Sequence, residues 1–227
     1  MKKLMSLVAL AMVGSVVAAS AQEVLSANAV GYVKRAVPAG KLQIVSIPFE
    51  NIASEDGTYK FGETQIANDL KQGSEVMFWD DAKQVWSGGS KSAKGWSAGE
   101  ANHVVVPGEA FFVRNNTSDD LEVTAAGEVP ADATLTRAYN GGKALSIVSA
   151  PYPVDIRFAD TEIAGQLPQG SEVMFWDDAK QVWSGGAKSA KGWSAGEANK
   201  VIAAGEGFFI RSTADDTWEA VKPYTWP

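Results

Sequence analysis

The segment QGSEVMFWDDAKQVWSGGSKSAKGWSAGEANH, residues 72–103, recurs as QGSEVMFWDDAKQVWSGGAKSAKGWSAGEANK, residues 169–200. The copies lie 97 positions apart and differ only at Ser90/Ala187 and His103/Lys200. A repeat of this length and identity predicts that the chain contains one structural unit twice. Two copies suggest two similar domains or one pseudo-symmetric domain, not a long solenoid.

The match continues on both sides of this segment. Downstream, GEAFFVR at 108–114 corresponds to GEGFFIR at 205–211, and upstream, LQIVSIPF at 42–49 corresponds to LSIVSAPY at 145–152. The upstream spacing is 103, so the first copy carries about six extra residues after that strand, and residues 55–59 are the expected extra loop. The polar stretch at 127–133 separates the copies. We therefore expect a module over 22–126 and a second over 127–227.

Each unit is rich in short strand signals. Apolar or β-branched runs bounded by turn residues predict strands at 42–49, 75–79, 84–86, 103–106, 110–114 and 121–124. Residues 63–70 have helical spacing and predict one short helix or turn, while the small, polar residues 87–100 predict a loop anchored by Trp96. The fold class is therefore all-β: two tandem homologous β-sandwich or small-barrel modules, which could pack pseudo-symmetrically.

Adjacent aromatic residues divide between the two faces of their strands. Successive side chains of a strand point to opposite faces, so Phe78 and Trp79 cannot enter the same core layer, and neither can Phe111 and Phe112. One member of such a pair is expected either at the surface or at an interface between the units.

The N-terminus has the three parts of a secretory signal. Lys2 and Lys3 precede an apolar run that ends near Ala18, and Ala19-Ser20-Ala21 forms a cleavage pattern. The run is short for a membrane span, which needs about 20 residues, so a signal peptide over 1–21 is favoured over an anchor helix. The expected location is the periplasm, the cell surface or the medium, with no integral membrane span in the mature chain.

Composition excludes several functions. The chain has 20 basic and 27 acidic residues, and loss of the leader would leave a net charge of −9, which disfavours nucleic-acid binding. There is no Cys, which excludes thiol catalysis and cysteine zinc sites. A core without disulfides must stabilise the chain.

The order of motifs resembles a known kind of module. A strand ending in Pro, then VMFWDDAKQVW, then PGEAFFV or AGEGFFI, is similar to the tandem β-rich modules of uncharacterised secreted and surface bacterial proteins. The resemblance covers nearly all of both units. It implies a β-sandwich-like module outside the cytoplasm, and it brings no catalytic residues.

Two motifs could carry chemistry. Gly95-Trp96-Ser97-Ala98-Gly99 and its copy at 192–196 match the G-x-S-x-G nucleophile elbow, which needs a histidine base. The only His is His103, and the second copy has Lys200 there, so a glycine loop pinned by a Trp is the favoured interpretation. The carboxylate pairs could ligate Ca²⁺ or serve as turn residues, and the turn is favoured because no EF-hand spacing is present; these pairs are Asp80-Asp81, Asp119-Asp120, Asp177-Asp178 and Asp215-Asp216.

Repeated tryptophans are the remaining candidates for a binding site. Exposed indole faces can stack on sugars, whereas buried ones fill the core of a small module. The candidate ligand-binding residues are Trp79, Trp86, Trp96, Trp176, Trp183 and Trp193. We identify no catalytic, cofactor or metal site. The sequence favours an exported, non-enzymatic structural or interaction protein, with a carbohydrate- or ligand-binding module as the alternative; the partner would be an envelope or surface protein or a glycan, and the oligomeric state is open.

Overall fold

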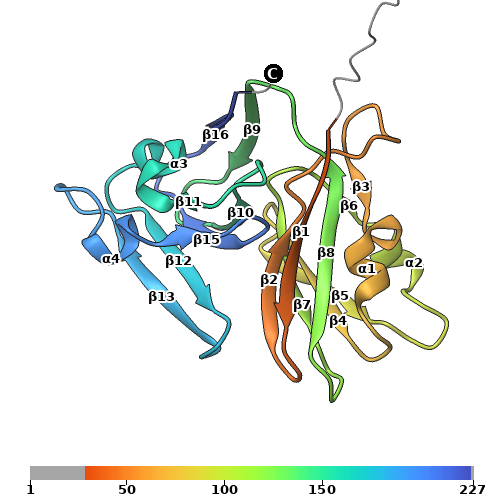
Figure 1. The fold of residues 1–227 in the computed structure, drawn as a ribbon. Coiled ribbons are helices and arrows are strands. Elements are labelled where there is room, and N and C mark those ends of the chain that lie inside the picture. Colours follow the sequence, from red (N-terminus) through yellow and green to blue (C-terminus); the bar gives the residue numbers. More distant parts are fainter. Residues whose placement is uncertain (1–28, 226–227) are drawn as a thin grey trace, which may run out of the picture.

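The computed structural model describes residues 29–225, so the predicted signal peptide and Trp226 lie outside the described residues. The fold is all-β, as predicted, and its antiparallel sheets form two similar groups (Figure 1). We call the first group module 1 and the second module 2. None of the helices in the described part has the length and apolarity that a membrane-spanning helix requires.

The elements follow one another in the same order in both modules. Module 1 contains β1 Val30–Val37, β2 Leu42–Ser46, β3 Tyr59–Lys60, η1 Phe61–Glu63, α1 Gln65–Asp69, β4 Glu75–Asp80, β5 Val85–Ser90, α2 Ala98–Ala101, β6 Val104–Val105, β7 Ala110–Arg114 and β8 Leu121–Glu128. Module 2 contains β9 Thr134–Tyr139, β10 Leu145–Ser149, β11 Ile156–Arg157, η2 Phe158–Asp160, α3 Glu162–Gln166, β12 Glu172–Asp177, β13 Val182–Ala187, α4 Ala195–Ala198, β14 Val201–Ile202, β15 Gly207–Arg211 and β16 Asp216–Val221.

A four-stranded antiparallel sheet is the centre of each module. Its order is β2-β7-β4-β5 in module 1 and β10-β15-β12-β13 in module 2. Two-stranded ribbons complete each module: β1-β8 and β3-β6 in the first, β9-β16 and β11-β14 in the second. The β1-β8 pairing continues to Glu128, so module 1 ends two residues after the boundary expected at 126.

Both faces of the central sheet are covered at β2, β4 and β7, whereas β5 is mostly exposed, and the alternation of side chains explains how. Val76 and Phe78 enter the core of module 1, while their neighbours Met77 and Trp79 join a third apolar cluster built by both modules. Module 2 has its own core. The expectation that Phe78 and Trp79 serve different layers is confirmed, and the second layer is the interface between the modules.

Three parts of the predicted secondary structure differ from the structure. The sequence signals predicted six strands per unit, whereas each module has eight. The two strands that were not predicted are β1 and the two-residue β3 in module 1, which correspond to β9 and β11 in module 2. Residues 87–90, expected in a loop, form most of β5. An added Cβ on Gly88 would lie 2.0 Å from the backbone oxygen of Val76, so the glycines that look like a loop permit close strand pairing. The helix expected within 63–70 is confirmed as α1, and α2 is a second short helix.

Candidate functional site

Trp79 and Trp176 hold the two modules together. The Nε1 of Trp79 donates a hydrogen bond of 2.8 Å to the carbonyl of Leu145, and the Nε1 of Trp176 donates one of 2.9 Å to the carbonyl of Leu42. Each donor lies in one module and each acceptor in the other. The reciprocal arrangement shows that the modules pack pseudo-symmetrically, as the sequence allowed.

Two further pairs of contacts repeat across this interface. The amide of Gln84 binds both the N–H and the carbonyl of Leu145, and Gln181 does the same to Leu42. Gln84 has φ of 56°, a left-handed conformation rare for a residue other than glycine, and its side chain explains why a glutamine stands there. Outside these contacts, Arg137 faces Asp81 at 3.5 Å and Arg35 faces Asp178 at 3.4 Å.

Trp96 and Trp193 are structural residues within their modules. The Trp96 ring packs edge-on against Phe61, 5.1 Å between centroids, and its Nε1 donates to the carbonyl of Ala67 at 3.1 Å. Lys91 donates to the carbonyls of Ala67 and Leu70 at the end of α1. Module 2 repeats these contacts with Trp193 and Lys188.

Trp86 and Trp183 are the candidate tryptophans with substantial exposure. Trp86 and Trp183 are each 43% exposed. Both rings contact Phe112 and Phe209, with centroid distances from 4.8 to 6.1 Å, so they lie at the rim of the interface cluster. Of the three repeated positions, this one is the most exposed.

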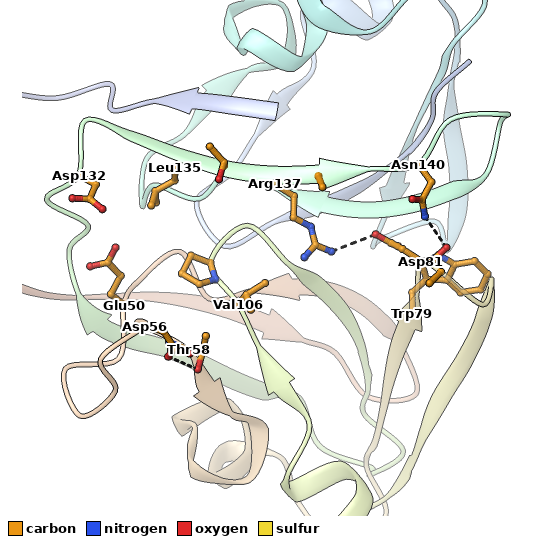
Figure 2. A pocket seen from close by; sticks show the side chains of 14 residues that line it. Glu50, Asp56, Thr58, Trp79, Asp81, Val106, Asp132, Leu135, Arg137 and Asn140 are labelled. Carbon is orange, nitrogen blue, oxygen red and sulfur yellow. Dashed lines mark hydrogen bonds and ion pairs between the residues drawn. The ribbon is translucent and has the colours of Figure 1, made fainter. Parts of the chain in front are cut away.

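A cleft of about 670 Å³ lies between the modules (Figure 2). This volume is in the range of small-ligand sites, about 300–1,000 Å³, which often occur between domains. Figure 2 shows Glu50, Asp56 and Asp132 at one end and Arg137 and Asp81 at the other. The lining residues are Glu50, Asp56, Thr58, Trp79, Asp81, Ala82, Val106, Pro107, Asp132, Leu135, Thr136, Arg137, Ala138 and Asn140.

The extra loop of module 1 explains the position of the cleft. Glu50, Asp56 and Thr58 form part of the wall, and they flank or belong to the additional residues that module 2 lacks. The symmetry-related cleft beside Asp178 has about half the volume, 330 Å³. There the buried Gln43 donates a 2.5 Å hydrogen bond to Asp178. Ser146 occupies the position of Gln43 in module 2, and it makes no hydrogen bond to Asp81 among the described residues.

Carboxyl groups dominate the electrostatics of the inter-module cleft. Four carboxylates line it against one guanidinium. Burial, together with the nearby Asp132 and Glu128 carboxylates, raises the pKa of Glu50. Burial raises the pKa of Asp81 to about 6, although Arg137 opposes this shift. Hydrogen bonds from Ser54 and Thr58 lower the pKa of Asp56 to about 2.

The G-x-S-x-G motif is a helix cap. The Oγ of Ser97 accepts a 3.2 Å hydrogen bond from the N–H of Gly99 and donates one to Glu100, which is a capping arrangement at the start of α2. His103 instead stacks on Phe78 with ring centroids 3.6 Å apart, and its Nε2 lies 3.4 Å from Glu109. No hydrogen bond joins Ser97 to His103 within residues 29–225.

Lys200 takes the place of His103 in module 2 with the same contacts. Its Nζ lies 3.1 Å from Glu206 and 5.9 Å from the centre of the Phe175 ring. Within the near-identical segments 72–103 and 169–200, the one chemically notable difference is therefore a change between two residues that both face an aromatic ring and a buried glutamate.

The paired aspartates have separate structural contacts. Asp80 accepts from the N–H and the Nζ of Lys83 in the β4-β5 turn, and Asp177 repeats this with Lys180. Asp120 and Asp215 each accept a backbone N–H. Within the described part of the chain, no three His, Cys, Asp or Glu side chains come together as metal ligands.

Comparison with known proteins adds no assignment. No protein-family model, curated protein or solved structure matches this chain. The resemblance to secreted and surface modules stays a prediction. Sequence reasoning missed the cleft as a whole, since its lining comes from distant segments. It had singled out Trp79, Asp81 and the extra loop at 55–59, all of which contribute to the lining.

Proposed function

We propose that this chain is an exported, non-enzymatic interaction protein of the bacterial envelope or surface, and that it binds a partner in the inter-module cleft. The observation that supports a binding role most directly is the cleft of about 670 Å³, which only one of two pseudo-symmetric positions provides at this size. A scaffold whose two halves are packed and hydrogen-bonded together and which has one enlarged cleft is suited to holding a ligand between them.

The engagement of the candidate nucleophile supports a non-enzymatic role. Ser97 caps α2, and His103 contacts Phe78 and Glu109 rather than Ser97. A serine hydrolase needs its nucleophile and base within hydrogen-bond reach. In module 2, Ser194 is the equivalent helix cap, and Lys200 stands at the position of His103, so this copy contains no histidine base.

Cell fractionation tests the exported part of this proposal. A chain with a C-terminal tag should appear in the periplasm, on the surface or in the medium, with residues 1–21 removed, as N-terminal sequencing would reveal. A cytoplasmic chain that retains Met1–Ala21 would contradict the proposal. An esterase and glycosidase panel tests the second part, and turnover that disappears in Ser97→Ala would contradict a non-enzymatic role.

Carbohydrate binding through tryptophan is a second candidate, favoured by the exposure of Trp86 and Trp183. Their partly exposed rings could stack on sugar faces. A fluorescence titration with oligosaccharides should respond in the native protein and lose its response in the Trp86→Ala/Trp183→Ala variant. Trp96→Ala is the control that separates this effect from loss of packing, because Trp96 binds Ala67 inside its own module.

A further inference from the structure

The free edge of β9 faces the inter-module cleft. Four consecutive residues of this strand, Leu135 to Ala138, line the cleft. Neighbouring side chains of a strand point to opposite faces, so four consecutive lining residues place the backbone of β9 itself against the cleft. The other edge of β9 is occupied by β16, and β9 has no second partner strand in the described structure.

An unpaired edge presents backbone N–H and C=O groups that another strand can bind. In peptide recognition by strand addition, backbone hydrogen bonds supply affinity and alternate side chains supply specificity. The wall opposite β9 includes the apolar residues Val106 and Pro107. The cleft therefore combines an unpaired strand edge with an opposite wall that carries apolar side chains.

The charge of the cleft specifies the side chains of such a segment. The carboxylates of Glu50, Asp56 and Asp132 lie together at one end (Figure 2). The only cationic side chain in the lining is Arg137, at the other end, where it faces Asp81 at 3.5 Å. A ligand that places ammonium or guanidinium groups near Glu50 and Asp132 would reduce the mutual repulsion of these carboxylates.

We propose that the inter-module cleft binds an extended, positively charged polypeptide segment that adds as a strand to the free edge of β9. This proposal rests on the proposed function only in placing the ligand in the same cleft. The symmetry-related cleft would not accept such a segment, because Lys34 and Arg35 line it together with Asp178 alone as an acidic group.

Binding of a fluorescent Lys-Val-Lys-Val-Lys peptide to the mature protein tests this proposal. Anisotropy should show saturable binding, and the matched Glu-Val-Glu-Val-Glu peptide should not bind. Asp132→Lys should weaken binding by tenfold or more. The control is Glu63→Lys, which makes the same change of charge at an exposed glutamate that does not line the cleft, and it should leave affinity within about twofold.

Backbone methylation of the probe separates strand addition from simple charge attraction. A Lys-Val-Lys-Val-Lys peptide with N-methyl groups on alternate residues keeps its charges but loses donors on one edge; of the two possible methylation registers, one should bind at least tenfold more weakly. Equal binding by the unmethylated Lys-Val-Lys-Val-Lys peptide and its two methylated forms would overturn strand addition. No peptide binding, equal loss in Glu63→Lys, or binding of neutral oligosaccharides alone would overturn the whole proposal. Because these measurements use purified protein, failure of peptide binding can be distinguished from failure of export in the fractionation experiment.

Discussion

Trp79 and Trp176 are each bound to the module opposite their own. Trp79 reaches the carbonyl of Leu145 and Trp176 that of Leu42, at 2.8 and 2.9 Å. A tryptophan that fills the interface and also satisfies a backbone carbonyl of the partner module couples packing to hydrogen bonding. The reciprocity makes the two modules one unit, and it keeps the walls of the inter-module cleft together.

Replacement of either indole by a phenyl ring should weaken this interface by a similar amount. Trp79→Phe keeps an aromatic ring but removes the donor to Leu145, whose carbonyl still accepts from Gln84 at 2.8 Å. We expect a loss of about 1 kcal/mol in the free energy of unfolding, from urea denaturation. Trp176→Phe should match it, and Trp86→Phe, at a half-exposed ring, should have a smaller effect. Unchanged midpoints in both interface variants would contradict this role.

Gly207 should not tolerate a methyl group. An added Cβ would lie 2.2 Å from the Cβ of Ala110 and 2.5 Å from the Ile44 side chain, both of which belong to module 1. Gly207→Ala should therefore lower the free energy of unfolding by about 1–3 kcal/mol through overpacking. Gly196→Ala is the control, because its Cβ would meet only the Ser194 side chain at 3.6 Å. Equal stability of the two variants would argue against tight packing at Gly207.

Asp81 should make stability depend on pH. Its pKa is raised to about 6 in the folded protein, mainly by burial, while the ordinary value is 3.8, so the folded state binds a proton first as pH falls. The contribution of this group to stability therefore increases between pH 7 and about pH 4. Arg137, Glu109 and Asp80 act on the same carboxyl.

The Asp81→Asn variant isolates this contribution. At pH 7.5 the free energy of unfolding of Asp81→Asn should exceed that of the native protein by about 1 kcal/mol, because the variant buries no charge at this position. The difference should shrink towards pH 4.5. Urea unfolding at four pH values between these limits measures it. Parallel profiles for the variant and the native protein would show that Asp81 does not titrate in this range.

The serine of each GWSAG segment should affect stability alone. Ser97→Ala removes the acceptor for the N–H of Gly99, and Ser194→Ala removes the acceptor for Gly196. Each should cost about 0.5–2 kcal/mol, because both serines cap short helices. Thermal unfolding should show similar shifts for the two variants. A stability change confined to one copy would contradict the equivalence of the two caps.

Much of the fold could be predicted from local sequence. The repeat revealed the two modules, and alternation along EVMFW placed Phe78 and Trp79 in different layers, as the structure confirms. The glycine-rich strand from Ser87 to Ser90 was missed because glycine carries no β-branched signal, and its reason for being there is the nearby backbone of Val76.

The candidate site depended on tertiary structure. Six tryptophans were equal candidates in the sequence, since a residue type and its spacing do not specify burial. Only the packing of one module on the other separated the interface residues Trp79 and Trp176 from the exposed Trp86 and Trp183. The inter-module cleft likewise joins Glu50 with Arg137, residues far apart in the chain.

The sequence by itself determined that one β-rich unit occurs twice and which side chains share a strand face, because repetition and alternation are local properties. The tertiary structure decided that the two units form a single pseudo-symmetric body, and that only one of its two clefts is enlarged. The difference in size between the clefts depends on a loop present in one copy and on Gln43, where the other copy has Ser146. Neither feature shapes a cleft until segments far apart in the chain pack together.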